Sequence, residues 1–171
     1  MKSVTKLPLY IGLFVMTIAV VVSAVKLSDN RSSERVKAGT ANSSLSLNFS
    51  SPDIVSLAVT SDQVVAGVDA AIKFDDDKIT ILPSSLKGEG TFITSGGRVD
   101  DGNNLFSFSA ISSTGVKAGI IATFKVKPKN NSNIETSLQL DDSGKTTVLS
   151  KSTGENISVS TSGVKFNITA K

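Results

Sequence analysis

The stretch that decides the fold is VVAGVDAAIKFDDDKITIL, residues 64–82. Its apolar side chains recur at every second position, as Val68, Ala70, Ile72 and Phe74. The positions between them hold Asp69, Ala71 and Lys73. Because successive side chains of a β-strand point to opposite sides of a sheet, this alternation predicts a strand with one buried face. The acidic run that follows predicts a tight polar turn before a second strand near Ile79.

The period of two extends through the chain from residue 44 onward. Alternating or β-branched runs predict strands over 45–49, 54–60, 64–74, 78–82, 91–94, 105–111, 120–127, 134–140, 146–149, 156–160 and 164–168. Clusters of Gly, Asn, Asp, Ser and Pro predict turns over 50–53, 75–77, 95–104, 127–133, 141–145 and 152–156. No segment with a helical period lies between them. The pattern therefore predicts one all-β domain, 44–171, folded as an antiparallel sandwich of about nine strands.

A different kind of segment precedes this domain. Residues 8–25 carry no charge, and as a helix they would extend about 27 Å, enough to cross a bilayer core. We therefore expect a transmembrane signal-anchor helix at 8–25, after a basic segment at 1–7. The polar residues 26–43 are expected to form a solvated tether. The alternative is a cleaved signal peptide cut near Ala24, which would leave a secreted protein.

The expected location is extracytoplasmic, at the cell surface. An all-β, cysteine-free domain rich in Ser, Thr and Asn behind an N-terminal apolar segment is typical of exported surface modules. The flanking charges point the other way, because four basic residues follow the apolar run, whereas Lys2 and Lys6 precede it. We favour export, and the sequence alone leaves the orientation open.

Composition excludes several function classes. The chain has no histidine and no cysteine, so it lacks the side chains most used for proton transfer, thiolate attack and soft metal sites. Beyond residue 43 there are 12 basic and 13 acidic side chains, with Arg98 the single arginine. Such a near-neutral domain offers no basic face for phosphates, so nucleic-acid binding is not expected. No paired carboxylates or activated serine stand out, and we do not expect an enzyme.

Two stretches resemble a known family. In residues 64–82, a Gly-Val-Asp entry leads an alternating strand that ends in Phe74-Asp75. In GIIATFKVK, residues 119–127, a glycine leads a second strand whose apolar face is predicted to hold Ile120, Ala122, Phe124 and Val126. The order and separation of these blocks are similar to those of the cohesin domain and its bacterial cohesin-like relatives. The resemblance extends over residues 44–169, although Asp76 replaces the usual proline and SSPDIVSLAVT replaces a glycine-led second strand.

The resemblance implies a nine-stranded antiparallel jelly-roll β-sandwich that binds a protein partner through one sheet face, as cohesins bind dockerins. The chain has no repeated Asp-x-Asn-x-Asp-Gly loop of the dockerin type, so a dockerin-like partner would come in trans. No cofactor is implied. The motif residues, with structural roles, are Gly67, Asp69, Phe74, Asp75, Gly119 and Phe124.

Acidic loops are the candidate calcium sites, because Ca²⁺ prefers oxygen ligands. The candidates are Asp75, Asp76, Asp77, Asp100 and Asp101. Ordinary solvated turns account for the same residues, and this is the simpler interpretation.

Two other functions are weighed against protein binding. A carbohydrate-binding module would bind a polysaccharide through exposed Trp or Tyr rings, whereas this domain has neither and its phenylalanines sit mainly at alternating strand positions. A structural surface subunit of the pilin type ranks last, because residues 8–25 contain no glutamate.

Overall fold

The structure is a computed structural model that describes residues 43–130 and 133–169. These residues form nine β-strands, and they contain no helix long and apolar enough to cross a bilayer. The all-β class and the nine strands are confirmed. The predicted segments 1–7 and 8–25, and the tether up to residue 42, lie outside the described residues. The strands are β1 (Ser44–Ser51), β2 (Ile54–Phe74), β3 (Ile79–Gly88), β4 (Ile93–Asp100), β5 (Leu105–Pro128), β6 (Ile134–Leu140), β7 (Thr147–Ser150), β8 (Ser160–Ser162) and β9 (Val164–Ile168).

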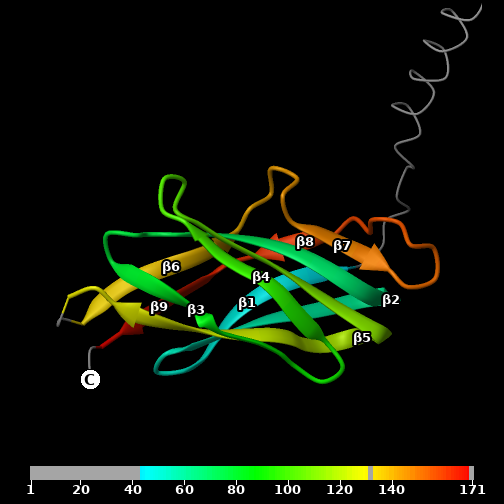
Figure 1. Cartoon of the computed structure of the whole chain (residues 1–171), viewed down its shortest axis with the longest axis horizontal. Helices are drawn as coiled ribbons and strands as arrows, with labels where there is room; N and C mark the ends of the chain where they lie inside the picture. The colour runs from blue at the N-terminus through cyan, green and yellow to red at the C-terminus, as the bar shows by residue number, and fades with distance from the viewer. Residues whose placement is uncertain (1–42, 131–132, 170–171) are drawn as a thin grey trace, which may run out of the picture. The chain divides into compact units, whose positions relative to one another are not determined.

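The two longest strands, β2 and β5, take part in both layers of the sandwich (Figure 1). The first half of β2 pairs with β1 and with the second half of β5. Its second half pairs with the first half of β5, with β6 and with β7. The sequence predicts four separate strands here, at 54–60, 64–74, 105–111 and 120–127. In the structure, 54–60 and 64–74 both belong to β2, and 105–111 and 120–127 both belong to β5. The strands are continuous because Val65 pairs with Val116 within the irregular stretch.

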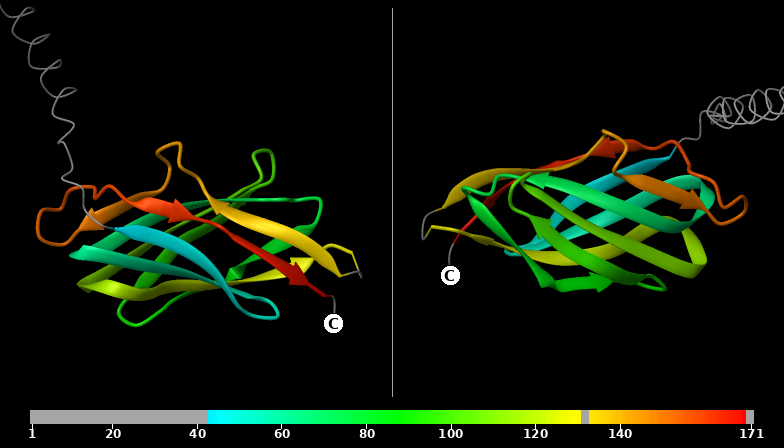
Figure 2. Two further views of the ribbon diagram at one scale, coloured as in Figure 1. Left: turned by 180° about the vertical axis from the view of Figure 1, so that it is seen from behind. Right: turned by 45° about the horizontal axis from the view of Figure 1, so that its top comes forward.

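The two layers share these long strands and differ in their neighbours. One layer has the order β4–β5–β2, with β6 and β7 along the far edge of β2. The other has the order β3–β5–β2–β1–β8, in which β8 runs parallel to β1. The chain then passes from β8 into β9, which pairs with β6 of the first layer (Figure 2). One chain segment therefore connects the layers at this edge.

Side chains from both layers fill the interior. Phe106, Phe108 and Phe124 form its aromatic centre, with ring centroids 5.4 Å apart for the first two and 5.1 Å apart for Phe106 and Phe124. Tilted aromatic pairs of this kind contribute about 0.5–1.5 kcal/mol beyond the burial of their area. The alternation predicted for the second half of β2 is confirmed, since its inward residues are all buried: Val68, Ala70, Ile72 and Phe74.

The predicted alternation fails at the start of the second motif block. Ile120 was expected on the buried face but is 49% exposed, whereas Ile121 is fully buried. Leu57 pairs with Ala122 and Ala58 pairs with Ile120, so Ile121 has no residue opposite it. This bulge reverses the alternation at one position and explains the error.

Several strand boundaries also differ from the sequence prediction, and β3 extends to Gly88, beyond the predicted end at residue 82. β4 continues to Asp100 through the predicted turn at 95–104. Its pairing with β5 shifts in register between Ser95 and Arg98, and the two glycines lie within this irregularity. The predicted strand at 156–160 is wrong as well. Asn156 makes only an isolated bridge to Leu149, and the strand begins at Ser160.

Candidate binding face

An apolar row crosses four strands on the outer side of the β4–β5–β2 layer. Ile93 of β4 lies opposite Ile111 of β5, and Ile111 lies opposite Gly67 of β2. Gly67 in turn lies opposite Leu149 of β7, whose Cδ1 would be 3.2 Å from a Cβ placed on the glycine. Ile93 is 72% exposed and Ile111 61%. Neighbouring exposed aliphatic side chains on adjacent strands make a contiguous patch, which is more informative than a single exposed residue.

A polar row runs beside the apolar one and is centred on Asp69. Ser109 Oγ donates to Asp69 Oδ1 at 2.5 Å, and Thr147 Oγ1 donates to Asp69 Oδ2 at 3.3 Å. Ser95 lies opposite Ser109 on β4. Cross-strand hydrogen bonds of this kind hold neighbouring strands in register. We call the apolar row and this polar row together the binding face.

The loop between β6 and β7 is fixed to the edge of the same layer. Asp141, with a side chain 2% exposed, pairs with Lys73 Nζ at 2.7 Å. It also accepts hydrogen bonds from the backbone N–H and the hydroxyl of Ser143. The hydrogen bond from Lys73, followed by those from Ser143, holds the pKa of Asp141 at about 2, although burial acts in the opposite direction. Thr146 Oγ1 bonds both backbone groups of Ala71, so the loop is anchored at two points.

The six motif residues divide between the binding face, the interior and two turns. Gly67 and Asp69 lie on the binding face, and Phe74 and Phe124 are buried. The backbone oxygen of Asp75 accepts hydrogen bonds from the N–H groups of Lys78 and Ile79 in the turn between β2 and β3. Gly119 has a φ of 143° beside the bulge at β5, a conformation that favours glycine.

The candidate calcium residues do not converge on one point. Within residues 43–130 and 133–169, no group of three or more acidic side chains is arranged to hold a metal ion. Asp75 pairs with Lys78 at 3.2 Å, and Asp76 pairs with Lys129 at 2.9 Å. The side-chain amide of Asn103 donates to Asp100, which lowers the pKa of that carboxyl. The structure thus gives ion-pair and turn roles to Asp75, Asp76 and Asp100.

The phenylalanines do not form a surface platform. Phe49 is half-buried and stacks on the buried Phe166, with ring centroids 4.2 Å apart. A sugar stacks on an exposed ring, and the described residues present none on the binding face. The other phenylalanines of residues 43–130 and 133–169 are buried: Phe74, Phe92, Phe106, Phe108 and Phe124.

Sequence reasoning missed the three large side chains of the apolar row. The run from 105 to 111 contained a usable signal, because Phe106 and Phe108 define the buried parity and Ile111 falls on the serine side. An isoleucine at an outward position next to two serines indicates an exposed apolar residue. The sequence around Ile93 and Leu149 did not show that these residues face outward. Their strands are too short or too irregular for a clear alternation of apolar and polar residues.

No family model matches the chain, and no curated protein matches its sequence. Solved structures do match. A non-cellulosomal cohesin from the hyperthermophilic archaeon Archaeoglobus fulgidus superimposes with a TM-score of 0.58 at 14% identity, over 76% of this chain and 93% of that chain. The fold is that of a cohesin domain.

Cohesins from other organisms give similar superpositions on this cohesin-like domain. A Clostridium thermocellum structure of a type I cohesin–dockerin complex matches with a TM-score of 0.55 at 10% identity, over 78% of this chain and 98% of that chain. An Acetivibrio cellulolyticus structure of a type II cohesin–X–dockerin complex matches with 0.54 at 16% identity, over 76% and 100%. The resemblance based on residues 64–82 and 119–127 is confirmed at the level of the fold.

Proposed function

We propose that the chain is a membrane-tethered, extracytoplasmic cohesin-like module that binds a protein partner through the binding face, for adhesion or scaffolding. The apolar row carries this proposal, because contiguous exposed aliphatic side chains on a sheet are typical of interaction sites. Ser95 and Ser109 beside the row supply hydroxyls for the polar contacts that surround an apolar interface centre.

The proposed partner is a dockerin-like protein supplied in trans. Two of the similar cohesins are part of complexes with dockerins, and this chain shares their fold. Four strands at a spacing of about 4.8 Å give the face a width of about 14 Å, which suits one helix of about 10 Å diameter lying across it. A helix that presents two or three aliphatic side chains would cover Ile93 and Ile111 together.

The proposed tether is the N-terminal part of the sequence. Residues 8–25 have the length and hydropathy of a transmembrane helix, and residues 26–43 are polar enough to separate the domain from the bilayer. N-terminal sequencing of the mature protein tests this part. A first residue at Val25 would show that the protein is released by cleavage rather than tethered.

Partner binding is tested with residues 44–171 immobilised as bait for cell-surface extract. The unchanged domain should retain a protein, and a variant with Ile93→Asp and Ile111→Asp should retain less than about a hundredth as much, because a buried charge at an interface centre costs several kcal/mol. Ile120→Asp is the matched control, since Ile120 is exposed on the opposite layer. Recovery of a polysaccharide without any protein would refute the proposal and support the carbohydrate-binding alternative.

A further inference from the structure

Strands β6 and β8 separate to form a fork at the edge where the two layers meet. β9 pairs with β6 up to Val164 opposite Leu138. If this register continued, Leu140 would lie opposite Ser162. Leu140 is the next residue of β6 whose backbone N–H and C=O point away from β2. Ser162 instead pairs with Ser46 of β1. The chain therefore leaves β6 at Gly163, where a Cβ would come within 2.3 Å of the Leu138 carbonyl oxygen.

The backbone groups of two residues face into this fork from its two sides. The Ser160 N–H donates to the backbone oxygen of Ser43, the residue before β1, so the next residue, Thr161, directs its N–H and C=O away from β1. Directly after β6, the Asp141 N–H donates to the backbone oxygen of Ala71, so Leu140 directs its N–H and C=O away from β2. Neither Thr161 nor Leu140 has a strand partner on that side within the described residues. The fork is thus bordered by two open strand edges.

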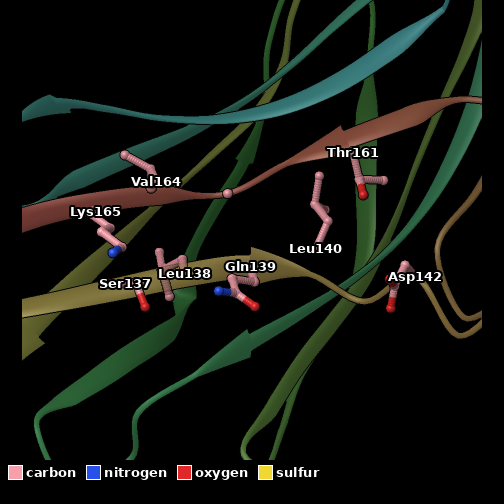
Figure 3. Close-up of a pocket in the computed structure, with 9 residues that line it drawn as sticks. Ser137, Leu138, Gln139, Leu140, Asp142, Thr161, Val164 and Lys165 are labelled. Atoms are coloured by element: carbon pink, nitrogen blue, oxygen red, sulfur yellow. The ribbon is translucent and has the colours of Figure 1, made fainter.

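A cavity of about 320 Å³ lies in the fork. Figure 3 shows Leu140 and Thr161 between the two strands, with Lys165 and Ser137 toward one end and Asp142 toward the other. The ends therefore carry opposite charges. Five polar side chains line the cavity without a side-chain hydrogen bond or ion pair to the described residues, and they are Ser137, Gln139, Asp142, Thr161 and Lys165.

We propose that this fork is a second binding site, separate from the binding face, which takes a short extended peptide segment of a partner protein by β-strand addition. Open strand edges supply the backbone hydrogen bonds that give such binding its affinity, and flanking side chains supply its specificity. A segment lying between Thr161 and Leu140 bonds both residues through its own N–H and C=O groups. An acidic residue of the segment lies at Lys165 and a basic residue lies at Asp142, so the site also fixes the direction of the segment.

The test uses the full-length chain in detergent micelles and a phage-displayed library of random heptapeptides. We expect selected peptides to carry one acidic and one basic residue at opposite ends of a β-prone core. Thr161→Pro replaces an N–H that faces the fork and has no partner in the strand ladder, and it should weaken their binding at least about tenfold. Thr161→Ala is the matched comparison, because it removes the side chain but keeps the N–H, and it should weaken binding less than Thr161→Pro does. Both variants should unfold at the temperature of the unchanged chain.

The double variant Lys165→Glu with Asp142→Lys reverses the charges and should select peptides with the opposite charge order. The proposal is wrong if the library yields no peptide that distinguishes Thr161→Pro from Thr161→Ala. It is also wrong if the chain alone forms a dimer that Thr161→Pro abolishes, since a second copy would then occupy the fork. Retention of protein on the binding face, tested with Ile93 and Ile111, is a separate result and does not affect this outcome.

Discussion

The two outer faces of the domain are built on the same pair of long strands, yet they present different chemistry. On the binding face, Ile93 and Ile111 lie side by side without a charged side chain between them. On the opposite face, Lys125 pairs with Asp53 at 3.0 Å, and Ile120 is a single exposed apolar residue opposite Ala58. An exposed apolar residue forms part of a patch only when its cross-strand neighbour is also apolar. The register of the strands decides which residue that neighbour is.

The largest expected difference in the free energy of unfolding is between variants at an inward and at an outward position of β5. Phe106→Ala should lower the free energy of unfolding by about 3–5 kcal/mol, because it leaves a cavity in the aromatic centre. Ile111→Thr, five residues further along β5, should change it by less than about 0.5 kcal/mol. Chemical denaturation of both variants checks this difference. A large loss for Ile111→Thr would mean that this side chain supports the fold rather than binds a partner.

Glycines of the two layers should also respond differently to an added methyl group. A Cβ on Gly88 of β3 would lie 2.1 Å from the backbone oxygen of Phe92, so Gly88→Ala forces the backbone apart and should cost more than about 2 kcal/mol. A Cβ on Gly67 meets the end of the Leu149 side chain, which is able to move. Gly67→Ala should therefore cost less than about 1 kcal/mol while it displaces Leu149 and weakens partner binding. Thermal unfolding measures the first effect, and the pull-down measures the second.

The ion pairs of the two faces should differ in their pH dependence. Asp141 has a pKa of about 2 in the folded domain against an ordinary 3.8, so its stabilisation is complete above about pH 4 and is lost as pH falls toward 2. Asp141→Asn should cost about 1–3 kcal/mol at neutral pH and should flatten the stability profile in that acid range. Asp53→Asn should cost less than about 0.5 kcal/mol, because the Lys125–Asp53 pair is exposed. Denaturation at several pH values between 2 and 7 compares the two. Equal acid sensitivity in the unchanged domain and Asp141→Asn would contradict this assignment.

The sequence predicts those parts of the fold in which local alternation and burial agree. The strand predicted at 134–140 is observed with the same bounds, and the inward side of 68–74 is correct. Alternation also placed Asp69 on an outward face, although it gave no reason to group this residue with residues of other strands.

The rest depends on contacts between residues far apart in the chain. The bulge at Ile121 arises from pairing with β2, which the local sequence of β5 does not reveal. The Lys73–Asp141 ion pair joins two strands by way of the β2–β6 register. The apolar row and the fork at Gly163 are likewise products of register and of the path of the chain. Such features are fixed only when the strand order is known.

The smallest expected difference in stability is between variants that remove side-chain hydrogen bonds from the binding face and from the opposite face. Asp69→Ala removes the common acceptor of Ser109 and Thr147, and it should cost about 1 kcal/mol by loosening β7 and β5 from β2. Asn48→Ala on the opposite face removes one long bond of 3.4 Å to Ser46 and should change stability by less than about 0.3 kcal/mol. Amide hydrogen exchange is the sharper measurement, because Asp69→Ala should speed exchange along β7 selectively. Equal effects of the two variants would show that the Asp69 hydrogen bonds are surface contacts without a role in holding β7 and β5 to β2.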